Sequence, residues 1–215
     1  MPTRSSPPDW SSPAASARKH SAACRAGGKK AFRHFRELVS ELLCVTIAHR
    51  EASVWMPKPK AGRPTRSDLF GGHGPGDSLV RLNNDAYLRL IVSLFLKHDG
   101  PDRHLRASMC TYQYQFDPAG DERVFRYEYR RDCDAGDNRP MGHLHVRGDL
   151  RTDCLPAKGT LERVHFACGR PTIEGVIAVL ADEFGVPTHA PESVWRPLLR
   201  KTEQAFLRVA HPTTT

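Results

Sequence analysis

One alternating stretch constrains the fold more than any other part of the chain. Residues 107–116 (ASMCTYQYQF) and 123–131 (RVFRYEYRR) alternate apolar or aromatic side chains with polar ones, and DPAGDE separates them. This alternation predicts two half-buried strands, and the intervening proline and glycine suit a turn, so we expect a β-hairpin. Its aromatic face comprises Cys110, Tyr112, Tyr114, Phe116, Phe125, Tyr127 and Tyr129, and its opposite face carries Arg126, Glu128 and Arg130.

Further strand patterns flank this hairpin. Residues 87–97 (YLRLIVSLFLK) fit a strand and also a helical stripe, and we favour the strand because the segments that follow are β. Two shorter strands are expected in GHLHVRG (142–148) and LERVHFA (161–167), each after a polar loop. Strands that follow one another without intervening helices favour an antiparallel sheet of about four to five strands with one face covered.

Helical periodicity occurs on both sides of these strands. An apolar stripe over residues 171–185, which ends at Gly185, predicts the one helix that packs on the sheet. An N-terminal amphipathic helix is expected from Lys30 to near His49. The C-terminal segment, residues 191–210, is also helical in pattern, but Pro197 should split or kink it. The predicted fold class is therefore α+β.

These patterns divide the chain into four parts. Residues 1–29 are rich in Ser, Pro, Ala and basic residues with little to bury, and we expect a disordered leader. Residues 30–55 contain the amphipathic helix. Residues 56–78 form a Pro/Gly-rich linker, because 4 Pro and 5 Gly among residues 56–77 oppose regular structure. The α+β core with its C-terminal helices is expected over residues 79–210.

The positive charge is concentrated near the beginning of the chain. Residues 1–66 hold 13 Lys and Arg against 4 Asp and Glu, a net charge of +9, whereas residues 67–215 hold 19 against 20. An excess of this kind attracts nucleic-acid phosphates in a salt-dependent way, or simply keeps a protein soluble. The leader is therefore a candidate contact for RNA or DNA.

The sequence also bears on the compartment. No apolar run approaches the roughly 18 residues of a membrane-spanning helix, and the first 20 residues lack the apolar stretch of a secretory signal. The six cysteines are sparse and irregularly spaced, which does not suit a disulfide scaffold. We expect a cytoplasmic protein with reduced thiols and no membrane partner. The oligomeric state is not defined by the sequence.

Three histidines form the most specific candidate site. His143 and His145 are two apart on an expected strand and so point to the same face, and His165 follows twenty residues later on the next strand. If these two strands pair, the three imidazoles converge, and a three-histidine zinc site with an open position for water becomes feasible.

Two other interpretations of the same residues stay open. Without a metal, the histidines can act as acid and base while Arg126 and Arg130 stabilise charge on a phosphoryl group. Alternatively, the two histidines are simply polar side chains on the wet face of a sheet. No cofactor is predicted, and the presence of a metal is left undecided.

Part of the chain resembles a known group of proteins. Residues 124–186, including RYEY, HLHV, VHFACGR and IEGVIAVLADEFGV, are similar to a group of actinobacterial proteins of unassigned activity that are often encoded beside helix-turn-helix regulators. A more distant resemblance is to TumE-type toxin–antitoxin proteins, although this chain is longer and its histidine cluster is less dense. The resemblance implies a two-gene context with a helix-turn-helix partner and identifies no catalytic residue.

Three functions follow from these observations. The first is a toxin-like component that works with a helix-turn-helix partner and acts on or binds nucleic acid. The second is a non-catalytic interaction protein that docks on a DNA-binding partner through an apolar stripe at residues 32–43 or 195–206. The third is a zinc-dependent hydrolase. Whether the chain is an enzyme is therefore left open by the sequence.

Overall fold

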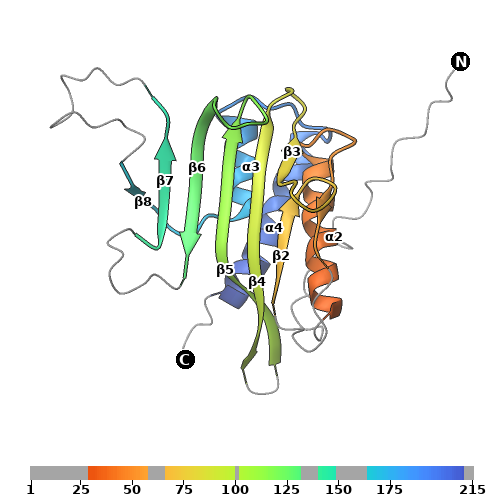
Figure 1. Ribbon diagram of the computed structural model, residues 1–215. Helices are drawn as coiled ribbons and strands as arrows, with labels where there is room; N and C mark the ends of the chain where they lie inside the picture. Colours follow the sequence, from red (N-terminus) through yellow and green to blue (C-terminus); the bar gives the residue numbers. More distant parts are fainter. Residues whose placement is uncertain (1–28, 58–65, 100–101, 132–139, 149–163, 211–215) are drawn as a thin grey trace, which may run out of the picture.

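The computed structural model describes residues 29–57, 66–99, 102–131, 140–148 and 164–210 (Figure 1). Residues 1–28 of the predicted leader thus lie outside the described residues. In chain order the elements are α2 (Lys29–Val45), β1 (Val54–Trp55), β2 (Arg66–Gly71), β3 (Leu79–Arg81), β4 (Tyr87–Asp99), β5 (Asp102–Gln115), β6 (Arg123–Arg130), β7 (Gly142–Val146), β8 (Phe166–Ala167), α3 (Ile173–Asp182) and α4 (Glu192–Ala210).

The described strands form one antiparallel sheet, which confirms the α+β class. Their order is β1-β2-β4-β5-β6-β7-β8, and β3 pairs with β4 alongside the part of β4 that β2 leaves free. The described sheet has eight strands rather than the predicted four to five. β1 and β3 are too short to show alternation, and β2 lies in a segment whose proline and glycine content argues against a strand.

Strand β2 lies within the segment expected to be a Pro/Gly-rich linker. Ser67, Leu69 and Gly71 are buried and alternate with more exposed residues, so β2 has the pattern of a half-buried strand. It pairs with β4 from Arg66 opposite Phe95 to Phe70 opposite Ile91. Residues 66–71 therefore belong to the sheet, because β4 is long enough to bind two partners along one edge.

The predicted hairpin is confirmed as β5 and β6. Tyr112 pairs with Tyr127 and Tyr114 with Phe125, so the aromatic side chains share one face as expected. Cys110, Tyr112 and Tyr114 are buried on this face. Phe116 differs, since it follows the last residue of β5 and is 54% exposed.

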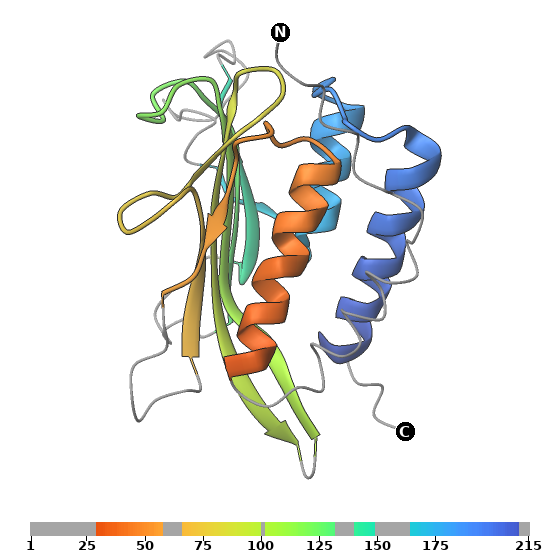
Figure 2. The ribbon, with the colours of Figure 1, turned by 90° about the vertical axis from the view of Figure 1, so that its right-hand side faces the viewer.

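Three helices, rather than one, cover the aromatic face of the sheet. Figure 2 shows the sheet edge-on with α2, α3 and α4 on the same side. α3 supplies Ile177 and Leu180, which are fully buried, as its stripe predicts. α2 supplies Phe32 and Leu42, because its apolar stripe packs on the same core.

The C-terminal helix continues through its proline. α4 runs without interruption from Glu192 to Ala210 and contains Pro197, so the predicted split does not occur. Proline at this position removes one backbone donor, but Trp195 before it and Leu198 after it are both buried and hold the helix on the core. Residues 32–43 and Trp195, expected as docking stripes in the second function, are thus largely used inside the chain.

The other face of the sheet is covered by none of the described helices; we call it the open face. It carries alternate residues of the central strands, including Arg89 and Ile91 of β4, Thr111 and Gln113 of β5, and Arg126 and Glu128 of β6. The open face is where the predicted site residues lie.

None of α2, α3 and α4 combines the length and apolar character that crossing a bilayer requires.

Candidate metal centre on the open face

The register of the last strands brings the three histidines to one place. His143 pairs with Glu128 and His145 with Arg126, so all four side chains project from the open face. On the other side of β7, His143 pairs with Ala167. Continuing this antiparallel register by two residues places His165 opposite His145. The convergence thus depends on two pairings, β6 with β7 and β7 with β8.

The imidazoles are close enough to share a ligand. One nitrogen from each of His143, His145 and His165 lies within 4.8 Å of the other two. The ring centroids are 4.9 Å apart for His143 and His145, 4.9 Å for His143 and His165, and 4.6 Å for His145 and His165. We call these three residues the histidine cluster.

The histidine cluster is shielded from solvent. His143 is 5% exposed and His145 is 6% exposed, while His165 is half-buried. This burial differs from the expectation of polar side chains on a wet sheet face. Polar side chains that are withdrawn from water need partners, because a lost hydrogen bond is costly in a poorly hydrated environment.

A carboxylate of β6, Glu128, completes the group. The Oε2 atom of Glu128 lies 3.2 Å from Nε2 of His143 and 3.4 Å from Nε2 of His145. Its Oε1 atom lies 3.5 Å from Nε of Arg126. Alternation predicts only that Glu128 is a polar residue of its strand, and the β6–β7 register shows that it faces the histidines.

The charge of Glu128 is stabilised by its neighbours. Burial raises the pKa of its carboxyl group, but the positive charge of Arg126, the hydrogen bond with His143 and the charge of His145 outweigh burial and lower the pKa below its usual 4.5. Glu128 is therefore an anion at neutral pH. An anion beside three imidazoles attracts a proton or a metal cation into the cluster.

The hydrogen bonds of His143 limit how the cluster can hold a proton or a metal ion. Its Nδ1 atom lies 2.9 Å from the carbonyl oxygen of Pro140, which can only accept, so Nδ1 carries hydrogen. Its Nε2 atom faces the Glu128 carboxylate, which also only accepts. Two arrangements satisfy both contacts: a doubly protonated imidazole, or an imidazole whose Nε2 binds a metal ion beside the carboxylate.

Glycine at position 142 allows β8, which follows His165 directly, to approach β7. A Cβ atom on Gly142 would lie 2.7 Å from the carbonyl oxygen of Cys168 and 2.9 Å from that of Gly169. The backbone amide of Cys168 donates to the carbonyl oxygen of Gly142 at 3.0 Å. The close contact of β7 with the chain after β8 therefore requires a residue without a side chain.

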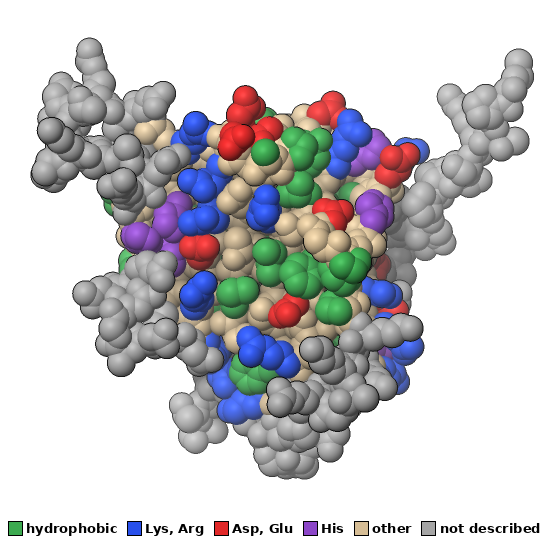
Figure 3. All heavy atoms as spheres, in the orientation of Figure 1, with side chains coloured by type: hydrophobic (Ala, Val, Ile, Leu, Met, Phe, Trp, Pro, Cys, Tyr) green, Lys and Arg blue, Asp and Glu red, His purple; other side chains and the backbone are tan. Residues whose placement is uncertain are grey.

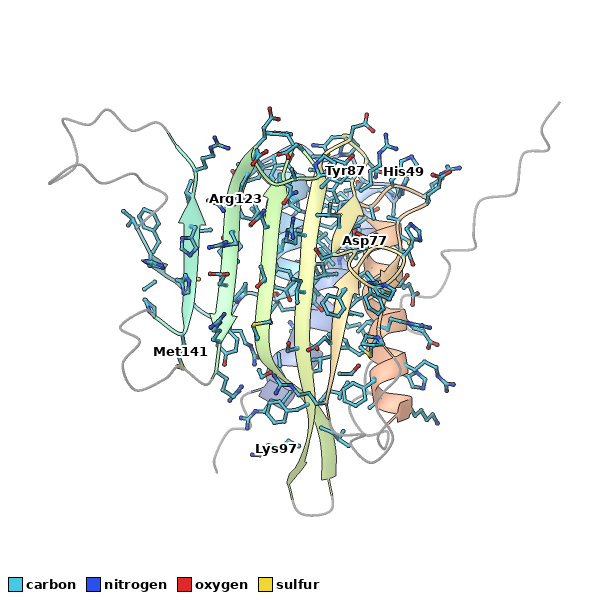
Figure 4. All side chains as sticks on the ribbon, viewed as in Figure 1. His49, Asp77, Tyr87, Lys97, Arg123 and Met141 are labelled. Carbon is cyan, nitrogen blue, oxygen red and sulfur yellow. The ribbon has the colours of Figure 1, made fainter. Side chains whose placement is uncertain are left out.

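The remaining predicted residues have different positions. Arg126 belongs to the site through Glu128, whereas Arg130 is exposed two residues beyond Glu128 on the same strand face. Cys168, which follows β8, is half-buried and burial raises its pKa, which disfavours the thiolate form that binds metal. Cys133 and Cys154 lie outside the described residues. Figure 4 shows the side chains of β6 and β7 between the labelled Arg123 and Met141.

A separate hollow lies on the helix side of the sheet. Its volume is about 390 Å³, and its lining includes Tyr127, Arg170 and Glu203 but none of the three histidines. It is therefore on the opposite side of the sheet from the histidine cluster. We assign no part of the histidine chemistry to it.

Searches against protein-family models, curated proteins and solved structures found no match to this chain. The resemblance to the actinobacterial group and to TumE-type proteins thus stays a prediction. The function is inferred below from the residues of this chain alone.

Proposed function

We propose that this chain binds one divalent transition-metal ion, with Zn²⁺ the best fit, through His143, His145 and His165, and uses it for hydrolysis. The observation that carries the proposal is the approach of three imidazole nitrogens to within 4.8 Å, with a carboxylate oxygen beside two of them. Imidazole is a preferred ligand of Zn²⁺, and three histidines plus water is a known catalytic zinc set.

The distances support a tetrahedral site. Ligand atoms about 2.1 Å from a tetrahedral zinc ion lie about 3.4 Å from one another. Oε2 of Glu128 is 3.2 Å from Nε2 of His143 and 3.4 Å from Nε2 of His145, so it is close enough to these two ligand atoms to contact a water in the fourth position. The three histidine nitrogens lie within 4.8 Å of one another, so the widest pair would close by at most about 1.4 Å to reach this spacing.

The surrounding hydrogen bonds have the form expected around a metal ligand. The carbonyl of Pro140 accepts from Nδ1 of His143, which fixes the tautomer that leaves Nε2 free to bind metal. Arg126 balances the charge of Glu128, which keeps the carboxylate ionised. If the three histidines held the ion, a water molecule would take the fourth position, and Glu128 would lie where it could accept a proton from that water.

The test is metal content measured on the untagged protein, because a histidine tag would bind metal itself. We expect close to one Zn²⁺ per chain by mass spectrometry after reconstitution and removal of excess metal. His145→Ala should lose this binding. His73→Ala, which changes an exposed histidine on a loop, should retain it.

Activity is measured on a chromogenic phosphodiester with and without the metal. We expect hydrolysis by the zinc-loaded protein, loss of hydrolysis in EDTA, and recovery when zinc is returned. Wild-type protein that retains no more metal than His145→Ala would overturn the proposal.

A second function is favoured by one specific contact. Both ring nitrogens of His143 face acceptors, as they do in a doubly protonated imidazole that serves as an acid. With a second imidazole as base and Arg126 near the reacting group, this arrangement gives metal-free cleavage of a phosphoester. Activity that is unchanged in EDTA and lost in His143→Ala would support this alternative instead.

The biological setting rests on the sequence alone. A helix-turn-helix partner, a two-gene context and a toxin-like role stay predictions, as does the contact of the leader with RNA or DNA. The two chemistries proposed above are both compatible with a toxin-like role. The docking alternative requires a surface other than α2 and Trp195, since these pack within the core.

A further inference from the structure

We propose that the substrate of this site is a single-stranded nucleic acid whose phosphodiester backbone crosses the open face of the sheet. The path runs along Arg89, Gln113, Arg126 and His145. This inference rests on the proposed hydrolytic function, and it adds the substrate class. It is carried by strand register, by the charges on the open face and by an aromatic pair near the far edge.

The strand register forms a continuous row of side chains that leads into the histidine cluster. Arg89 of β4 pairs with Gln113 of β5, Gln113 pairs with Arg126 of β6, and Arg126 pairs with His145 of β7. Partners in adjacent strands lie about 4.8 Å apart, so the row extends about 14 Å from Arg89 to His145. A ligand bound along it would have one end at the histidines.

Two arginines of the open face have no anionic partner among the described residues. Neither Arg89 nor Arg106, which pairs with Phe95 on the same face, makes an ion pair with any described residue. The Nε atoms of both are hidden from solvent without a hydrogen-bond partner among the described residues. A buried guanidinium nitrogen without an acceptor is costly, and a phosphate oxygen is the acceptor that guanidinium groups bind best.

The charge distribution on the open face is asymmetric. Figure 3 shows Lys and Arg side chains gathered around the histidines, with acidic side chains fewer among them. Of the acidic side chains on this face, Glu128 is already held by Arg126 and two histidines. A polyanion is therefore attracted to this part of the face, and its phosphates are steered toward the cluster.

An aromatic pair lies near the other edge of the same sheet. Trp55 of β1 and Phe70 of β2 stack with their ring centroids 5.0 Å apart and their planes at 19°. The indole Nε1 donates to the carbonyl oxygen of Asp77 at 3.1 Å, which fixes the ring. Fixed, half-exposed rings offer stacking surfaces for unpaired bases.

These features favour a single strand over a duplex. The described helices all lie behind the sheet, so none is available on this face to enter a major groove (Figure 2). A sheet surface with basic and aromatic side chains is instead suited to a strand whose bases are unpaired. RNA and DNA share this chemistry, and the experiment distinguishes them.

The test is fluorescence anisotropy with a labelled oligonucleotide of about 12 nucleotides, in EDTA so that no metal-dependent cleavage occurs. The probes are single-stranded RNA, single-stranded DNA and duplex DNA of the same sequence. The variants of the full chain are Arg89→Gln/Arg106→Gln and a matched control, Arg33→Gln/Arg200→Gln, which removes two exposed arginines of α2 and α4. Circular dichroism verifies folding, and the single Arg106→Gln variant provides a milder perturbation.

We expect both single strands to bind more tightly than the duplex. The slope of log K against log salt should fall by about 1.4 in the open-face double variant, or about 0.7 for Arg106→Gln, because each lost phosphate contact removes about 0.7. The control should keep the wild-type slope. The tighter of the two single strands identifies the sugar preference.

Equal slopes in the open-face variant and the control would overturn the inference, since binding would then come from charge elsewhere in the chain. Tighter binding of the duplex would overturn it as well. Metal content is measured in the same preparations. If the protein binds zinc but no single strand, the nucleic-acid proposal is wrong and the hydrolytic proposal stands. If it binds single strands but no zinc, the metal proposal is wrong and the nucleic-acid proposal stands.

Discussion

Glu174 provides a quantitative test of how the core is built. It is the second residue of α3, it is 4% exposed, and it lines a cavity of about 20 Å³ together with Leu42 and Val92. Burial raises the pKa of its carboxyl group from 4.5 to about 7. The hydrogen bonds of the carboxyl group, including one with Thr202, oppose this rise without cancelling it.

The magnitude follows from the two pKa values. Each pKa unit corresponds to about 1.4 kcal/mol, so the difference between about 7 and 4.5 corresponds to about 3 kcal/mol. The folded protein holds a proton that the unfolded chain has already lost between these values. The contribution to stability is thus fully present below about pH 4.5, declines as pH rises, and is lost above about pH 7.

The perturbation is Glu174→Gln, which keeps the shape of the side chain and removes the titration. We expect the variant to gain about 3 kcal/mol relative to the wild type between pH 4.5 and pH 8.5, measured by urea unfolding at both values. Glu183→Gln, at the exposed C-terminal end of α3, is the control and should show no such gain.

The dipole of α3 opposes the effect of burial on Glu174, so the sign of the stability difference at high pH shows which of the two is larger. Glu174 lies in the first turn of α3, where the helix dipole favours a negative charge by about 0.3–2 kcal/mol. If that interaction exceeded the cost of burial, the wild type would become the more stable protein at pH 8.5. A constant difference between the two proteins across this pH range would likewise refute the reasoning.

Three other outcomes follow from the structure. Trp195→Ala should lower the free energy of unfolding by about 3–5 kcal/mol in urea titrations, because the indole is 3% exposed and its removal leaves a cavity between α4 and the core. Gly142→Ala should reduce zinc binding in equilibrium dialysis, because its Cβ would press on the carbonyls of Cys168 and Gly169; unchanged affinity would contradict the strand contact. Asp117 accepts from the backbone amides of Gly120, Asp121 and Glu122, and the hydrogen bond from Glu122 lowers its pKa below 3.8 despite slight desolvation. Wild-type stability should thus exceed that of Asp117→Ala above about pH 3.8, and this difference should shrink as the pH falls further, which thermal unfolding at pH 7 and pH 2.5 measures.

The elements that local periodicity determines were predictable from the sequence. The β5–β6 hairpin and α3 each have a long, regular pattern. β6 and α3 lie within the predicted residues, and β5 begins five residues earlier than predicted, at Asp102. α2 was predicted as a helix, but its position against the sheet depends on distant contacts, such as the hydrogen bond from the ring of His189 to the carbonyl of Ala48. A periodic pattern shows which face of a helix is apolar and not which element covers it.

The candidate site, too, could be predicted from the sequence only in part. Alternation alone places His143 and His145 on one face, since they are two apart on a strand. The approach of His165 requires the pairing of β7 with β8. This pairing consists of two residue pairs, and the sequence does not predict its register. Glu128 required the β6–β7 register, and nothing in its own sequence environment distinguishes it from a solvent-facing residue of the hairpin.

The position of the histidine cluster explains why a bound metal would matter to the fold as well as to catalysis. β8 has two residues, both exposed, and it pairs with β7 at the edge of the sheet. So short a pairing gives little independent stability. The three histidines lie on β7 and on the residue before β8, with Glu128 on β6, so a metal held by them would join the last three strands. The same ion that activates water would then hold in place the strand that supplies its third ligand, which couples metal binding to the structure of this edge.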